Sequence, residues 1–70
     1  MVLYEIPEDF FIVPTEAAWL LGKPVRELIE LQESGRLNKV IMTPGQHRRY
    51  NMREILALRS ELRTEQAVVR

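Results

Sequence analysis

The sequence has no cysteine and only one histidine in 70 residues. These shortages exclude a disulfide and a thiolate metal site, and they leave only carboxylates and one imidazole to hold a metal. Acid–base catalysis needs an oriented pair of groups in a pocket, and a chain this short with a single histidine offers little of either. We therefore expect a protein that is not an enzyme and that binds no metal or cofactor.

Long apolar runs are also missing, as is positive charge near the amino terminus. The longest apolar runs, at residues 10–14 and 17–21, are far too short to cross a bilayer. The first nine residues carry three carboxylates and no Lys or Arg, whereas a signal peptide needs positive charge there. The sequence thus predicts a cytoplasmic protein without a membrane contact.

The composition is that of a single globular domain, with 46% hydrophobic and 29% charged residues. Its formal net charge is zero, but the charges are separated along the chain. Residues 1–22 contain four carboxylates and no Lys or Arg, whereas residues 34–53 contain five Lys and Arg and no acid. Such a cationic block can neutralise several phosphates even in a neutral molecule. The pattern favours a nucleic-acid contact over an ordinary solvated surface.

Strand formers dominate residues 1–13 and predict a short strand over about residues 10–13, preceded by an apolar arm. This arm either folds back over the domain or packs on a neighbouring copy. A first helix follows, opened by Pro14 and capped by Thr15, and Gly22 supplies its left-handed stop residue.

Trp19 is the only tryptophan, and helical spacing places it off the inward stripe of this first helix. Two interpretations stay open for it. Its ring covers the core beneath Phe10 or Tyr4, or it is exposed and contacts a partner protein. The candidates for self-association are Tyr4, Phe10 and Trp19.

A second helix is predicted to begin at Lys23-Pro24, because proline suits the first turn, and to end at Gly35. Its buried stripe is expected to consist of Val25, Leu28 and Leu31, with Ile29 as a further candidate. The helix also carries three glutamates, which repel phosphates. If this helix enters a DNA groove, a basic neighbour must supply much of the affinity.

That basic neighbour is a predicted hairpin. Residues 37–42 have the pattern of a strand, and residues 43–46 fit a turn with proline second and glycine third. The return strand alternates, so that His47 and Arg49 share one face while Arg48 and Tyr50 share the other. Tyr50 is expected to point inward, which leaves at least one arginine at the surface.

A third helix is predicted after the hairpin, with Asn51 as its cap and Glu54 as the partner of a capping box. Its inward stripe is expected to consist of Ile55, Leu58 and Leu62. The helix should end near Arg63. The predicted organisation is an amino-terminal arm at residues 1–11, a folded domain at residues 12–63 and a carboxyl-terminal tail at residues 64–70.

The segment TEAAWLLG, the glycine thirteen positions after Gly22, the hydrophobic strand and the TPGQHRRY hairpin resemble the winged helix-turn-helix of the MerR superfamily. That superfamily includes the small excisionases, or recombination directionality factors, of phages and the short MerR-like regulators of actinobacteria. The resemblance covers about residues 12–62. It implies a mainly α fold with a small β-hairpin and a short amino-terminal strand or arm.

The resemblance further implies DNA binding, with the second helix in the major groove and the hairpin as a wing in the adjacent minor groove. The expected contacts from the second helix are Lys23, Arg26, Glu27 and Glu30. The expected contacts from the wing are His47, Arg48 and Arg49. The DNA backbone is expected to be contacted by Thr15 and Lys39.

A single module of this size reads only a few base pairs, because such modules bury about 600–1,000 Å². We therefore expect several copies side by side on double-stranded DNA, or a DNA-bound partner such as an integrase. The resemblance implies cooperative loading on repeated sites and DNA bending at the nucleoid, as in a phage-type excisionase. A short MerR-like transcription regulator is the alternative, and an interaction adaptor without DNA binding is the alternative of another class.

Overall fold

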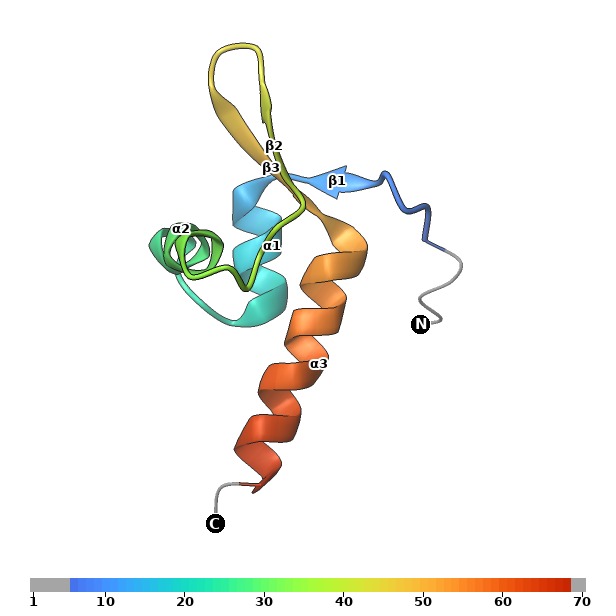
Figure 1. Cartoon of the computed structure of the whole chain (residues 1–70), viewed down its shortest axis with the longest axis vertical. Coiled ribbons are helices and arrows are strands. Elements are labelled where there is room, and N and C mark those ends of the chain that lie inside the picture. The colour runs from blue at the N-terminus through green and yellow to red at the C-terminus, as the bar shows by residue number, and fades with distance from the viewer. Residues whose placement is uncertain (1–5, 69–70) are drawn as a thin grey trace.

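The computed structural model describes the backbone of residues 6–68 and the side chains of residues 6–64. Within this part the elements are β1 (Phe11–Ile12), α1 (Pro14–Leu21), α2 (Val25–Glu33), β2 (Val40–Thr43), β3 (His47–Asn51) and α3 (Met52–Val68). The strands form one antiparallel sheet in the order β1-β3-β2. The fold is therefore a small α+β domain in which the β2–β3 hairpin stands out from the helices at one end and α3 runs toward the other (Figure 1).

The cap position of helix α1 lies two residues earlier than predicted. Pro14 is its first residue and Val13 occupies the cap position without a side-chain hydrogen bond. The prediction that Thr15 caps the helix is therefore wrong, because the fixed φ of proline already suits the first helical position and places Thr15 inside the first turn. At the other end Gly22 adopts the predicted left-handed conformation, with φ of 70°.

Helix α2 begins one residue later than predicted, because Pro24 is extended and forms its cap. Leu28 is fully buried and Leu31 is half-buried, as expected, but Val25 is 40% exposed. The prediction that Val25 belongs to the core is therefore wrong, and the reason is geometric. At 100° per residue, Val25 lies about 120° around the helix from Leu31, at the margin of the buried stripe.

The core lies between the sheet and the three described helices. Its buried members come from every layer, and they are Ile12, Ala17, Ala18, Leu28, Leu37, Tyr50, Ile55 and Leu58. Leu37 reaches this core from a loop, because β2 starts only at Val40 and not at the predicted residue 37. The amides of Asn38 and Lys39 donate to the Glu54 carboxylate, at 2.8 and 2.9 Å, in place of strand partners.

The side chain of Asn51 links the segment before β1 to the start of α3. Its side-chain oxygen accepts the Glu54 amide at 3.0 Å and so caps α3 as predicted, while its side-chain NH₂ donates to the Glu8 carbonyl. Arg53 forms an ion pair with Glu8 at 3.5 Å. Residues 8–12 thus fold back over the domain, and residues 1–5 of the predicted arm lie outside the described residues. Tyr4 lies outside the described residues.

Helix α3 extends beyond its predicted end at Arg63 and continues to Val68. The sequence contains no glycine or proline after Gly45, so nothing in it stops the helix. Part of the predicted tail at residues 64–70 is therefore helical.

Tyr50 makes the stability of the fold sensitive to alkaline pH. Its ring is buried in the core, and burial raises the pKa of its hydroxyl, with Arg48 acting in the opposite direction. The folded protein therefore keeps this proton at pH values where the unfolded chain loses it. The free energy of unfolding should decrease as the pH rises above about 10, the ordinary pKa of tyrosine.

The test is a comparison of urea unfolding curves for the native protein and the Tyr50→Phe variant across this alkaline range. The variant keeps the ring but has no hydroxyl to titrate, so its decrease should be smaller. An equally steep decrease in both proteins would contradict the prediction.

Candidate nucleic-acid interface

The β2–β3 hairpin turns through residues 43–46 as predicted. The Gln46 amide donates to the Thr43 carbonyl at 2.9 Å, and Gly45 has the positive φ, 88°, that this type of turn requires at its third position. The exposed His47 ring lies over the turn, since a Cβ added to Gly45 would be 3.2 Å from His47 Cδ2. His47 thus reaches solvent at the tip of the hairpin.

The register of the hairpin separates its two arginines as predicted. Arg48 pairs with Met42, and Arg49 pairs with Ile41, so the two guanidinium groups start on opposite faces of the sheet. Both arginine side chains are half-buried, while Ile41 and Met42 are 44% and 55% exposed. Each face of the hairpin therefore carries one arginine next to an exposed apolar side chain.

Arg48 connects the hairpin to α2. Its Nε donates to Gln32 Oε1 at 3.2 Å, and Arg49 donates from a terminal guanidinium nitrogen to the Arg48 carbonyl at 2.9 Å. Among the side chains that the structure describes, neither arginine has a carboxylate partner. Both charges are thus held in place and remain uncompensated. No sequence motif singles out Gln32, although its spacing of four from Leu28 places it near the buried side of α2.

Helix α2 presents a mixed set of charges. Arg26 and Glu30 are exposed, and Arg26 forms no ion pair within the described part of the chain. Lys23 and Glu27 instead pair with each other at 3.7 Å. Of the four residues predicted on this helix, Arg26 is therefore the cation with a free charge.

The remaining predicted contacts have different surroundings. Thr15 is exposed in the first turn of α1, and the Lys39 side chain is exposed directly before β2. Two further cations of the basic segment are engaged elsewhere, because Arg36 pairs with Glu61 at 3.5 Å and Arg53 pairs with the acidic arm. Within the described part of the chain, the cations of this segment without an ion pair are thus Lys39, Arg48 and Arg49.

Comparison with protein-family models, curated proteins and solved structures returns no match. Function is therefore inferred from the residues and the geometry. Within residues 6–68 no helix combines the length and apolar character needed to cross a membrane, and no three His, Asp or Glu side chains gather into a metal site.

The predicted self-association residues are exposed wherever they are described. Phe10 is 49% exposed and Trp19 is 79% exposed. The interpretation in which Trp19 covers the core is therefore wrong, because its position on α1 faces away from the inward stripe of alanines and leucines. A large aromatic side chain left in water is typical of a contact surface.

Proposed function

We propose that this protein binds double-stranded DNA as a winged helix-turn-helix, with α2 in the major groove and the β2–β3 hairpin as the wing. The observation that supports this most strongly is the pair Arg48 and Arg49. Neither has a carboxylate partner among the described side chains, both are fixed by hydrogen bonds, and one is bonded to α2 through Gln32. The hairpin also projects clear of the helices, so a duplex can approach it (Figure 1).

The two elements have different tasks in this proposal. Arg48, Arg49 and Lys39 bind phosphates or the narrow minor groove, which supplies affinity without reading the sequence. Arg26 reads a guanine edge in the major groove, and Glu30 accepts a hydrogen bond from a cytosine amino group. The exposed Met42 beside Arg48 offers an apolar contact for a sugar or a thymine methyl group.

The biological role that we propose is that of a phage-type recombination directionality factor. This rests on the resemblance of the TPGQHRRY hairpin and the helix pair to the MerR superfamily, together with the small interface that one module provides. Exposed Phe10 is available for contact between copies bound side by side. A short transcription regulator shares the same DNA-binding surface and is the alternative.

Footprinting and a salt series test this proposal together. Binding to duplex DNA should weaken steeply between about 50 and 200 mM salt, because cations released from the phosphates drive it. Footprints should extend over repeated sites, and a partner recombinase should strengthen them if the role is recombination. Affinity that does not depend on salt would contradict DNA binding. Footprints that stay the same when a recombinase is added would favour the role of a transcription regulator.

A further inference from the structure

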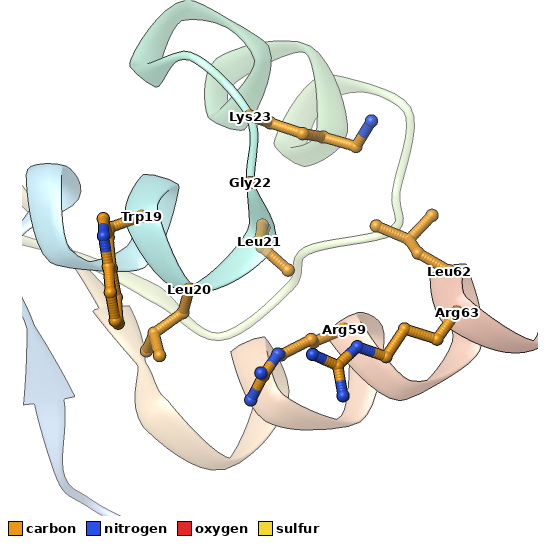
Figure 2. Close-up of a pocket in the computed structure, with 8 residues that line it drawn as sticks. All are labelled: Trp19, Leu20, Leu21, Gly22, Lys23, Arg59, Leu62 and Arg63. Carbon is orange, nitrogen blue, oxygen red and sulfur yellow. The ribbon is translucent and has the colours of Figure 1, made fainter.

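A second surface lies apart from the hairpin, between the carboxyl-terminal end of α1 and the exposed side of α3. It is an open groove of about 560 Å³. Its lining residues are Trp19, Leu20, Leu21, Gly22, Lys23, Arg59, Leu62 and Arg63 (Figure 2). The carboxyl-terminal end of α1 and the later turns of α3, which border this groove, lie away from the hairpin tip (Figure 1). Among its lining residues, only Lys23 is also an expected DNA contact.

Every charged side chain of the groove is a cation. Arg59 and Arg63 are one helical turn apart on α3, and Figure 2 shows the Arg63 side chain extending back toward Arg59. Neither arginine has an ion pair within the described residues, and Lys23 has only the 3.7 Å contact with Glu27. Like charges four residues apart on a helix repel each other, so a bound anion would stabilise this pair.

The opposite wall of the groove is apolar. The Trp19 ring is 79% exposed, and the half-buried Leu20 and Leu21 continue this wall toward the core, while Leu62 lies on α3 beside Arg63. Figure 2 places the tryptophan ring and the two guanidinium groups on different sides of one opening. The groove therefore offers an apolar contact and two cationic contacts a short distance apart.

We propose that this groove binds an acidic segment of a partner protein. An apolar or aromatic side chain of the segment packs on Trp19 and the leucines, and its carboxylates bind Arg59 and Arg63. The cationic lining without any carboxylate selects an acidic segment by charge complementarity. The high exposure of Trp19 favours a protein over a small molecule, because small-molecule sites bury most of their ligand and this groove is too open to do so. This inference goes beyond DNA binding and does not depend on it.

The fluorescence of Trp19 reports on the groove directly, because the chain has no other tryptophan. The probe is a short synthetic peptide in which Glu and Asp alternate with Leu and Phe. A matched peptide carries Gln and Asn in place of each acid. We expect the acidic peptide to shift the Trp19 emission to shorter wavelength and the amide peptide to bind at least about tenfold more weakly.

The variant Arg59→Gln with Arg63→Gln should also reduce binding of the acidic peptide at least about tenfold, because it removes both charge-assisted contacts. The control Arg26→Gln lies on α2 and should leave peptide binding unchanged while it weakens DNA binding. Circular dichroism of both variants verifies that the fold is retained.

The proposal is overturned by any of these results: no emission shift with the acidic peptide, equal binding of both peptides, peptide binding unaffected by the arginine variant, or a shift caused by duplex DNA. A concentration-dependent shift without any peptide would also overturn it, and would assign the groove to a second copy of this chain. DNA binding by the variant Arg59→Gln with Arg63→Gln is measured in parallel with peptide binding. The groove proposal and the DNA-binding proposal are therefore tested by two separate affinities, and either can fail without the other.

Discussion

Replacing Arg48 and Arg49 together with glutamine is expected to reduce the affinity for duplex DNA on the order of a hundredfold at low salt. Each charge-assisted hydrogen bond to a phosphate contributes about 1.5 kcal/mol, and the loss of two such bonds corresponds to about a hundredfold in affinity. Both guanidinium groups lack a carboxylate partner in the described structure, so little of their charge is used within the protein. The loss should be similar for all DNA sequences, and the slope of log K against log salt should decrease by about two.

Two control variants separate the charge of Arg48 from its position. Gln32→Ala removes the 3.2 Å hydrogen bond that fixes Arg48 but keeps the charge. It should cost far less affinity than the double substitution and leave the salt slope unchanged. Arg48→Lys tests the same distinction, since lysine keeps the charge without the planar guanidinium. Fluorescence anisotropy with a labelled duplex gives all four affinities. An unchanged affinity of the double variant would show that the hairpin is not the DNA-binding element.

Replacing Leu28 with alanine is expected to leave much of the protein unfolded at 25 °C. Leu28 is fully buried in α2, and removal of a buried leucine side chain costs about 2–5 kcal/mol. A domain of this size without disulfides has a total stability of only about 3–5 kcal/mol. Urea unfolding followed by circular dichroism measures the loss.

Val25→Ala is the matched control for this change, because it shortens an apolar side chain on the same helix. Val25 is 40% exposed, so its replacement should change the free energy of unfolding by less than about 0.5 kcal/mol. Similar losses in both variants would mean that α2 is not oriented with Leu28 inward. A specific DNA ligand should partly restore the fold of Leu28→Ala, since ligand binding favours the folded state.

The features that the sequence predicts well are those set by local chemistry. Gly22 stops α1, and the turn at residues 43–46 forms, because proline and glycine restrict the backbone within a few residues. Asn51 caps α3 because a side-chain oxygen next to a helix start has an amide to accept. The alternation of the hairpin places Tyr50 inward for the same local reason.

The features that the sequence does not predict depend on contacts between distant segments. Glu54 has the spacing of a capping box, but its carboxylate accepts two amides from the loop before β2. Arg53 belongs to the basic segment by sequence, yet Glu8 compensates it from the other end of the domain. Only the folded chain shows which cations stay free, so charge counting overestimates the cationic surface. The exposure of Trp19 was one of two open interpretations, and only the packing of α1 decides between them.

The position of β3 in the middle of the sheet sets the order in which the chain can acquire its structure. Phe11 pairs with Asn51, and more than half of the sequence separates the two residues. Contacts between residues that are far apart in the sequence form slowly, because a long loop must close before they can stabilise the fold. During synthesis the first strand therefore has no neighbour until the hairpin and the start of α3 have left the ribosome. We expect the nascent segment to stay open to proteases and chaperones until these elements have emerged, and to become resistant only after β1 has paired with β3.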